Sequence, residues 1–262
     1  AALVSGALLP TLQTALGQAK NEVQHVVVSR PTEPLPASLH DMAALVAQGQ
    51  AGVPASTLAD EPAFWLYSSG STGKPKGTVH TQGNLYWTAE LYGKPVLGLR
   101  ENDTVFSAAK LFFAYGLGNA YFALGTGATL VLHDSRPTVD AVADHVERHG
   151  VTLFFAVPTF LAQTLGSDTD PAAFATVRQG ITGGEPLPPE IGRRFLERFG
   201  VELLDGIGTT ELGHIFISQR PGRVRPGATG GDIADGNDWQ GGMSGRGECA
   251  VEPCAQTVEK RG

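Results

Sequence analysis

A segment rich in glycine, hydroxyl groups and lysine, Tyr67–Gly77 (YSSGSTGKPKG), has the residue types that bind phosphate. Glycines let a backbone turn sharply and approach a ligand closely, and here they stand at Gly70, Gly73 and Gly77. Hydroxyl donors stand at Ser68, Ser69, Ser71 and Thr72. The cations are Lys74 and Lys76. Hydroxyl donors and cations on such a backbone predict a loop that holds a polyphosphate.

Two other interpretations of this segment are weaker. A Walker A loop needs glycine at position 68 and Ser or Thr at position 75, where the chain has Ser68 and Pro75. A flexible Gly/Ser linker is the second interpretation, since such runs commonly connect domains. However, the apolar run Ala63–Tyr67 predicts a buried strand immediately before the segment. The loop would then lie at the carboxyl end of a strand, where α/β sheets bind ligands.

Two later loops carry carboxylates among glycines. Gly183–Leu187 (GGEPL) separates a predicted strand from a predicted helix, and Asp205–Glu211 (DGIGTTE) follows another predicted strand. A hard cation that bridges phosphate oxygens needs a carboxylate ligand, and Glu211 is suitably placed after a strand. Taken alone, Asp205 and Glu211 could equally be turn and cap residues, because Asp, Gly and Thr are ordinary in turns.

Sequence patterns for other chemistries are incomplete. Three Gly-x-Gly pairs, beginning at Gly116, Gly125 and Gly206, lack the third glycine of the dinucleotide-binding fingerprint. His145 and His149 stand four residues apart, but the zincin motif needs Glu directly after the first His. We therefore expect these two imidazoles on an exposed helix face. The Gly-x-Ser-x-Gly elbow of hydrolases does not occur in the sequence.

The segment YSSGSTGKPKG, followed in order by GGEPL and DGIGTTE, resembles the signature motifs of adenylate-forming enzymes. This family includes acyl-CoA synthetases, luciferases and the adenylation domains of peptide synthetases. The resemblance implies that the first loop binds the β- and γ-phosphates of ATP through Ser68, Ser69, Gly70, Ser71, Thr72, Gly73, Lys74 and Lys76. It implies adenine contacts at Gly183, Gly184, Glu185, Pro186, Asp205, Gly206, Ile207, Gly208 and Thr209. It also implies that Asp205 meets the adenine amino group, Thr210 the α-phosphate and Glu211 a Mg²⁺ ion.

Other segments resemble the benzoate-CoA ligase branch of this family. They are Lys110–Gly118 (KLFFAYGLG), Gly208–Phe216 (GTTELGHIF) and Arg220–Gly227 (RPGRVRPG). The resemblance places the wall of an aryl pocket at Phe113, Ala114, Tyr115, Gly208, His214 and Ile215. Flat apolar walls of this kind suit an aromatic acid whose carboxylate points toward the α-phosphate.

Alternative roles stay open for three residues of these segments. We expect Phe112 to pack in the core. Tyr115 could be a core tyrosine whose hydroxyl is satisfied by a neighbour. His214 could act as a general base, although a place in the pocket wall is favoured.

The resemblance implies two half-reactions. The carboxylate of an aromatic acid attacks the α-phosphate of ATP to give acyl-AMP and pyrophosphate, and the thiol of coenzyme A then displaces AMP. Adenylation requires neutralised phosphates and in-line placement rather than a protein nucleophile. Lys74, Thr210 and Glu211, with Mg²⁺, are therefore the expected catalytic groups. Two alternatives are a non-catalytic remnant that binds nucleotide or acid, and an enzyme that adenylates a different carboxylic acid.

The elements that must position these residues follow a βα pattern. Strands and helices alternate about every 20–25 residues from Ala128 onward, which favours an α/β fold of largely parallel sheets covered by helices. The resemblance implies part of the large N-terminal domain of an adenylate-forming enzyme. We expect strands at Val23–Ser29, Ala63–Tyr67, Thr104–Ala108, Ala128–Leu132, Thr152–Val157, Val177–Thr182, Val201–Leu204 and His214–Ser218. We expect helices at Ser38–Gln48, capped by Ser38, and at Asn84–Tyr92, Thr138–His149, Phe160–Leu165 and Pro189–Phe199.

The character of the sequence changes after Gly230. Residues 1–230 are expected to form a partial AMP-binding domain. Residues 231–262 are expected to form a Gly-rich, disordered tail, because their scattered apolar residues bury too little to offset the ordering entropy. The family's Tyr-x-Thr-Gly-Asp motif, hinge and small C-terminal domain are not found. The chain is therefore expected to be incomplete.

The composition limits which partners and which cellular compartment are expected for the chain. The chain has 19 Lys and Arg against 26 Asp and Glu, a net charge of −7, which argues against nucleic acid as a partner. The uncharged run Leu111–Leu132 is broken by Gly125 and Gly127, and so predicts a buried helix, a turn and a strand rather than a membrane span. The count of 2 cysteines suits a reducing cytoplasm. The sequence leaves the oligomeric state open.

Overall fold

The computed structural model describes residues 1–49, 52–68, 73–229 and 256–257. It divides the chain into two compact units, Ala1–Ser56 and Thr57–Gly262. Of the predicted tail, it describes only a two-residue strand, and the remaining tail residues lie outside the described ranges. The disorder predicted for the tail stays a prediction.

The first unit is a small parallel sheet with two helices. Its strands pair in the order β1 (Ala2–Ser5), β2 (Val26–Ser29) and β3 (His40–Asp41). The helices are α1 (Leu9–Gln18), which follows a 3-10 turn at Gly6–Leu8, and α2 (Met42–Gln48). The predicted cap at Ser38 is wrong. The side chain of Asp41 accepts a hydrogen bond from Ala43 N at 2.7 Å, so it caps α2, which begins three residues later than a Ser38 cap requires.

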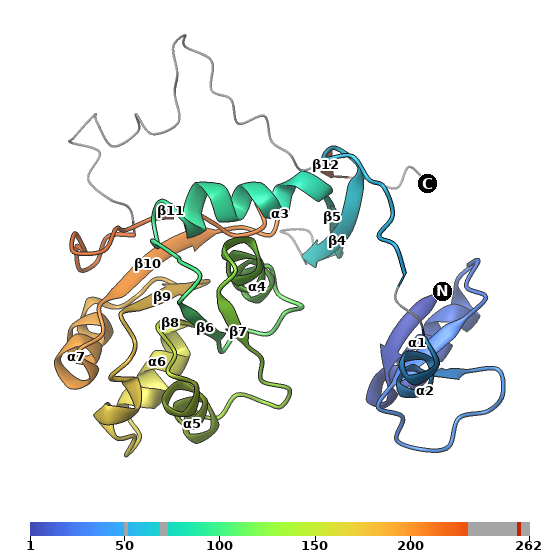
Figure 1. Cartoon of the computed structure of the whole chain (residues 1–262), viewed down its shortest axis with the longest axis horizontal. Helices are drawn as coiled ribbons and strands as arrows, with labels where there is room; N and C mark the ends of the chain where they lie inside the picture. The colour runs from blue at the N-terminus through green and yellow to red at the C-terminus, as the bar shows by residue number, and fades with distance from the viewer. Residues whose placement is uncertain (50–51, 69–72, 230–255, 258–262) are drawn as a thin grey trace, which may run out of the picture. The chain divides into compact units, whose positions relative to one another are not determined.

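A six-stranded sheet forms the centre of the second unit (Figure 1). The order is β11-β10-β9-β8-β6-β7, and every neighbouring pair is parallel except β10–β11. The strands are β6 (Thr104–Ser107), β7 (Thr129–Val131), β8 (Leu153–Ala156), β9 (Gln179–Gly183), β10 (Leu203–Gly208) and β11 (Ile215–Ser218). The helices between them are α4 (Ala114–Thr126), α5 (Val139–His149), α6 (Pro158–Leu165) and α7 (Pro189–Phe199), with a 3-10 turn at Pro171–Phe174. The predicted α/β fold is confirmed.

Strand β8 shows why the sheet is covered on both faces. All four of its residues are buried, and alternate side chains of a strand point to opposite faces. Phe154 belongs to one core, to which α5, α6 and α7 contribute apolar residues. Leu153 and Phe155 belong to a second core, which includes Phe122 of α4. The continuous apolar pattern of β8 is typical of a parallel strand between two layers of helices.

The uncharged run between Leu111 and Leu132 folds as the sequence predicts. Helix α4 ends at Gly127, whose φ of 76° lies in the left-handed region, and β7 follows. A glycine adopts this conformation without the steric cost that a side chain would add. Among the described residues, no helix combines the length and apolar character needed to cross a bilayer.

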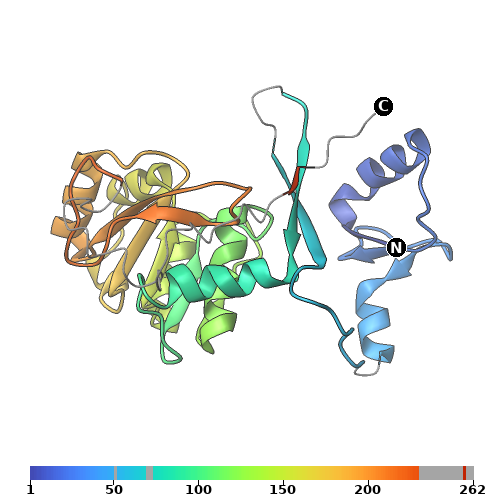
Figure 2. The same cartoon turned by 90° about the horizontal axis from the view of Figure 1, so that it is seen from above.

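A separate antiparallel hairpin carries the predicted phosphate loop. Its strands are β4 (Pro62–Ser68) and β5 (Lys76–Thr81), to which the short strand β12 (Gln256–Thr257) adds an antiparallel pairing. Helix α3 (Gln82–Thr88) follows β5 directly, leads from the hairpin toward the large sheet (Figure 2), and continues as a π-helical turn, Ala89–Gly93.

The strand predicted at Ala63–Tyr67 is present within β4, but the prediction that it is buried is wrong. Trp65 is 54% exposed and Tyr67 is 72% exposed, because β4 lies in the small hairpin sheet rather than in the large parallel one. The loop between β4 and β5 is therefore a hairpin connection. It follows the carboxyl end of a strand as predicted, but that strand pairs antiparallel with β5 and does not belong to the large parallel sheet.

Candidate functional site

The predicted adenine-binding loops follow two adjacent parallel strands, β9 and β10. Gly183 and Gly206 are paired in register at the carboxyl ends of these strands. A Cβ on Gly183 would lie 3.1 Å from Gly206 O, and a Cβ on Gly206 would lie 2.7 Å from Ile215 Cγ2. The glycines thus let β9, β10 and β11 pack closely. Gly184, with φ of 87°, turns the chain after β9, and Glu185 and Pro186 follow it on the surface.

Asp205 is buried between these loops, with 4% of its surface exposed. Its Oδ2 accepts hydrogen bonds from Leu187 N (3.4 Å) and Thr229 Oγ1 (3.1 Å). Its Oδ1 is buried and has no partner among the described residues. Burial raises the pKa of Asp205, although these hydrogen bonds act in the opposite direction. The site therefore holds a carboxylate oxygen that a ligand N–H could satisfy.

The residues predicted to meet the α-phosphate and Mg²⁺ lie on a turn between β10 and β11. Thr209 Oγ1 accepts a hydrogen bond from Leu212 N at 3.2 Å, and Thr210 O accepts one from Gly213 N at 3.3 Å. Ile207, Gly208, Thr209 and Glu211 are exposed. Within the described ranges, no group of three or more His, Cys, Asp or Glu could hold a metal alone. A single exposed carboxylate fits Mg²⁺ nevertheless, since this ion is usually bound by one or two carboxylates plus substrate phosphates.

The predicted phosphate loop is described only at its two ends. Ser68 ends β4 and pairs in register with Lys76, the first residue of β5. Gly73 has φ of 71°, and Lys74 is exposed. Ser69, Gly70, Ser71 and Thr72 lie outside the described residues, so their phosphate contacts stay predictions. Lys74 and Lys76 thus lie at the end of the hairpin where Ser68 pairs with Lys76.

The predicted aryl-pocket residues gather where α4 meets β9 and β11. Ala114 is the first residue of α4, and the next residue, Tyr115, donates its hydroxyl to Ile181 O at 2.9 Å. The rings of Tyr115 and His214 stack with centroids 5.4 Å apart. Burial raises the pKa of Tyr115 well above its ordinary value, so its hydroxyl stays protonated.

His214 is buried and held against the backbone of α4. Its Nε2 lies 2.9 Å from Asn119 Oδ1, and a Cβ on Gly118 would lie only 2.1 Å from its Cδ2. Burial lowers the pKa of His214 to about 3, so it is neutral near pH 7 and a weak base. This environment agrees better with a place in the pocket wall than with general-base catalysis.

The expectation for Phe112 is wrong, and so is the one for His145, whereas His149 is exposed as expected. Phe112 is 73% exposed rather than packed in the core, because it lies in the turn before α4, and Phe113 is also 58% exposed. His145 is not on a freely exposed helix face. Its ring stacks on Phe106, and its Nε2 lies 3.0 Å from His133 Nδ1. A neighbouring strand and loop therefore cover a histidine that its helical spacing placed outside.

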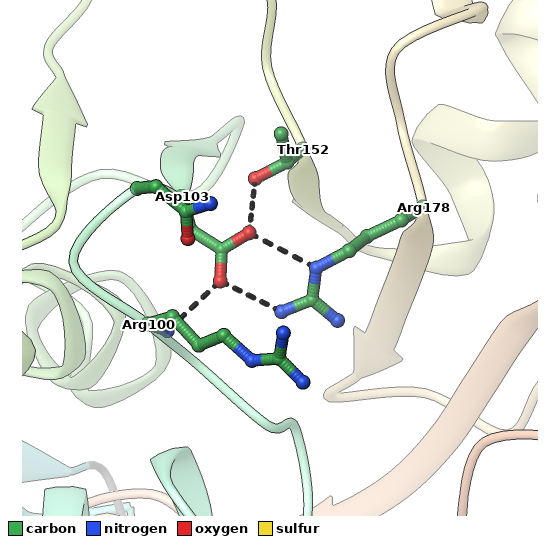
Figure 3. A pocket seen from close by; sticks show the side chains of 5 residues that line it. Arg100, Asp103, Thr152 and Arg178 are labelled. Carbon is green, nitrogen blue, oxygen red and sulfur yellow. Dashed lines mark hydrogen bonds and ion pairs between the residues drawn. The ribbon is translucent and has the colours of Figure 1, made fainter.

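A cavity of about 270 Å³ lies at the amino ends of the parallel strands of the large sheet, opposite to the carboxyl ends that carry the predicted adenine loops (Figure 3). Asp103, Thr152 and Arg178 line it with Arg100 and Asn102, and the first three each precede a parallel strand, β6, β8 or β9. The Asp103 carboxylate accepts hydrogen bonds from the Thr152 hydroxyl and the Arg178 guanidinium. The side chains of Asp103, Thr152 and Arg178 are thus paired with one another at the amino ends of these strands, whereas the predicted adenine loops follow carboxyl ends. The members of this cluster are distant in sequence and belong to no motif, so no sequence pattern predicts it.

Comparisons with known proteins agree with the motifs. The family model described as AMP-binding enzyme matches residues 2–239. The benzoate–CoA ligase of Thauera aromatica is 48% identical over 232 residues, which cover 87% of this chain and 43% of that protein. The 4-hydroxybenzoate–CoA/benzoate–CoA ligase of Rhodopseudomonas palustris is 42% identical over 233 residues, which cover 86% of this chain and 42% of that protein.

Solved structures show the same relation. A benzoate CoA ligase from Burkholderia xenovorans LB400 has a TM-score of 0.76 at 48% identity, and the match covers 88% of this chain and 45% of that one. The anthranilate CoA ligase AuaEII, solved with anthranoyl-AMP, has a TM-score of 0.80 at 32% identity, with 87% of this chain and 44% of that one covered. The chain spans less than half the length of the curated relatives it matches. On its fold, its motifs and the match over most of its length, the chain belongs to the AMP-binding enzyme family.

Proposed function

We propose that this chain carries the ATP- and acid-binding part of an enzyme that converts a benzoate-like acid into its acyl-adenylate and then into its CoA thioester. The observation that carries the proposal is the closeness of the two predicted subsites. A Cβ on Gly183 would lie 3.6 Å from Ile215 Cδ1 and 3.7 Å from Tyr115 Cε2. Only the space of one added carbon thus separates the predicted adenine turn from the predicted aryl wall, and a site that joins an acid to AMP requires such closeness.

The residues divide the first half-reaction among them. A carboxylate oxygen of the acid forms a bond to the α-phosphorus, and the bond from that phosphorus to the bridging oxygen of pyrophosphate breaks. Lys74 and Lys76 neutralise charge on the leaving pyrophosphate, and Thr210 meets the α-phosphate. Glu211 would hold Mg²⁺, which supplies further charge neutralisation at the phosphates when bound.

The acid side of the site favours a flat ring. Tyr115 and Ile215 offer apolar surface, and the neutral His214 adds no charge beside it. Such walls suit an aromatic acid better than a charged or strongly polar one. In the second half-reaction, the sulfur of coenzyme A attacks the acyl carbon and AMP leaves with the bonding electrons.

Pyrophosphate–ATP exchange tests this proposal. We expect benzoate to stimulate exchange, hexanoate to do so poorly, and Glu211→Gln to abolish it. Glu197→Gln, an exposed change on α7, should leave exchange unaltered and is the matched control. Absence of ATP–Mg²⁺ binding to the unaltered chain would refute the proposed function.

A second candidate is binding of nucleotide and acid without catalysis. The chain spans 43% of the T. aromatica ligase, so binding and catalysis are tested separately. Calorimetric binding of ATP–Mg²⁺ and benzoate without any exchange would support this candidate against the first.

A further inference from the structure

His80 is a buried histidine of β5 that the adenylation chemistry does not use directly. It is 1% exposed, and its ring stacks on Phe64 with centroids 4.9 Å apart and an interplanar angle of 12°. Its Nε2 lies 2.9 Å from Thr210 O, although 130 residues separate the two in sequence. This contact joins the phosphate-loop hairpin to the turn that carries Glu211.

A chain of hydrogen bonds fixes the proton of His80 on Nε2. Thr81 Oγ1 donates to Asn84 Oδ1 at 2.8 Å, so the amide nitrogen of Asn84 faces His80 Nδ1 at 3.2 Å. An amide nitrogen donates, and Nδ1 must therefore accept. The Nε2–H of His80 is then directed at Thr210 O, which as a carbonyl can only accept.

The turn closes directly on the imidazole ring. Gly213 has φ of 77°, and a Cβ there would lie 3.4 Å from His80 Cε1. Burial lowers the pKa of His80, while the hydrogen bond to Thr210 and the charge of Glu211 act in the opposite direction. The ring thus lies between Phe64 and the turn, and its Nε2–H donates to Thr210 O.

We propose that His80 is a positioning residue that fixes the turn Thr210–Gly213 against β5, and thereby sets Glu211 relative to the lysines of the phosphate loop. The inference rests on the proposed function, because it assigns His80 to the triphosphate and metal part of the same site. Lys76 and His80 lie on one strand, about 13 Å apart at an extended rise per residue. One strand thus carries a phosphate-binding cation at one end and the anchor of the metal-binding turn toward the other.

Substitution of His80 separates this role from general stability. His80→Leu keeps an apolar group beside Phe64 and removes the N–H, whereas His80→Gln can still donate a hydrogen bond from its terminal amide. We expect His80→Leu to weaken ATP–Mg²⁺ binding about tenfold, the order of one lost hydrogen bond, and to change adenosine binding less than about twofold. His80→Gln should recover most of the lost affinity. Backbone amide exchange at Thr210–Gly213 should rise in the Leu variant and stay low in the Gln variant.

A second variant keeps the inference testable if His80→Leu does not fold. Asn84→Ala removes the donor that fixes the ring and should weaken ATP–Mg²⁺ binding about threefold with adenosine binding unchanged. Equal losses for ATP–Mg²⁺ and adenosine, or unaltered ATP–Mg²⁺ binding by a folded His80→Leu protein, would overturn the inference alone. Failure of the unaltered chain to bind any adenine nucleotide would overturn both the inference and the proposed function.

Discussion

Asp205 presents its two carboxylate oxygens to different surroundings. Oδ2 accepts hydrogen bonds from Leu187 N and Thr229 Oγ1, whereas the buried Oδ1 has no partner in the described part of the chain. An exocyclic amino group of adenine would supply the missing donor. The sequence placed Asp205 next to adenine through motif resemblance, but only the folded structure distinguishes the two oxygens.

We expect Asp205→Asn to change purine preference. Because Oδ2 must still accept two hydrogen bonds, the new amide nitrogen takes the place of Oδ1 and faces the base as a donor. ATP binding should weaken about tenfold or more, and ITP, which has a carbonyl at that position, should lose far less. Calorimetric titration with both nucleotides measures the ratio. Asp140→Asn, an exposed change on α5, is the control, and equal losses for ATP and ITP would exclude this role.

Gly118 holds His214 in place by having no side chain. A Cβ at Gly118 would lie 2.1 Å from His214 Cδ2, so Gly118→Ala should displace the buried ring and lower the free energy of unfolding by about 1–3 kcal/mol. Gly192→Ala in α7 meets its nearest neighbour, Leu187 Cδ2, at an ordinary 3.4 Å. That control should be neutral or stabilising by about 0.5–1 kcal/mol, since alanine favours helix. Chemical denaturation of both variants compares them, and equal stabilities would contradict the packing argument.

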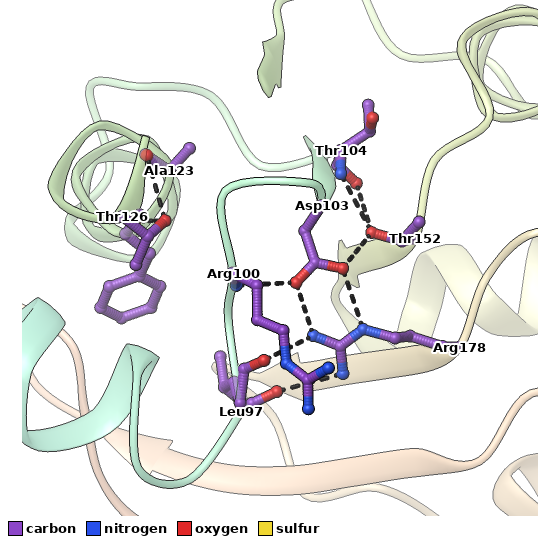
Figure 4. Close-up of polar contacts among 10 residues, drawn as sticks. Leu97, Arg100, Asp103, Thr104, Ala123, Thr126, Thr152 and Arg178 are labelled. Atoms are coloured by element: carbon purple, nitrogen blue, oxygen red, sulfur yellow. Dashed lines mark hydrogen bonds and ion pairs between the residues drawn. The ribbon is translucent and has the colours of Figure 1, made fainter. Parts of the chain in front are cut away.

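Asp103 and Arg178 connect the starts of three parallel strands (Figure 4). Arg178 Nε and Nη2 donate to the two carboxylate oxygens of Asp103 at 2.9 and 2.8 Å, and Arg178 also donates to Leu97 O and Gly98 O. The Thr152 hydroxyl completes the contact at 2.7 Å. This cluster ties the turn before β6 to the loops before β8 and β9.

We expect Arg178→Met to lower the free energy of unfolding by about 2–3 kcal/mol, because it leaves the nearly buried Asp103 carboxylate without its cation. The value lies at the lower end for a buried pair, since the Arg178 side chain is 39% exposed. Arg148→Met removes the exposed ion pair with Asp144 and should cost less than about 1 kcal/mol. Urea denaturation of the two variants gives the comparison, and similar losses would refute the special role of the cluster.

The same cluster predicts a pH dependence. Burial alone would raise the pKa of Asp103, but the hydrogen bonds from Arg178, Thr152 and the Arg100 backbone outweigh it and hold the pKa below its ordinary value of 3.8. The stabilisation is therefore complete above that value and is lost as the pH falls through the lower pKa of the folded state. In Asp103→Asn, unfolding free energy should depend less on pH below about pH 4. Parallel denaturation curves with identical pH slopes would contradict this.

At the scale of elements, segments with a clear apolar pattern could be predicted, including both outer strands of the large sheet, β7 and β11, whereas a strand buried through polar side chains could not. The pattern of β8 and the apolar spacing of α5 gave elements within two residues of those observed. Strand β5 was not predicted because its buried positions are the polar residues Thr78 and His80. A pattern of apolar and polar residues predicts that such side chains face solvent. Tertiary contacts bury them. The same holds for the candidate site. Its glycine-rich loops could be predicted from motifs, whereas Asn119 and His80 could not, because their hydrogen-bond partners lie about a hundred residues away in sequence.

At the scale of the whole molecule, the described part of the segment that joins the two compact units is exposed and contains no helix or strand. Residues 52–57 have no regular structure, Val53 is 95% exposed, and Leu58 is 66% exposed. Thermolysin, which cuts before large apolar residues, should therefore cleave near Val53 or Leu58 before it cuts within the helices and strands of either unit. Mass spectrometry of early digests measures this, and initial cleavage within α4 or β8 would contradict the division into units.

The residues that helix α4 supplies affect how the acid preference of a related site can change. Its first turn supplies Ala114 and Tyr115, and its second turn supplies Gly118 and Asn119, which hold His214. The loops assigned to the nucleotide come instead from β9 and β10. Under the proposed function, the choice of acid is therefore shared between the first two turns of α4 and the segment that carries Gly208, His214 and Ile215. Substitutions at a few of these positions would change which acids bind, while the residues assigned to ATP stay unchanged.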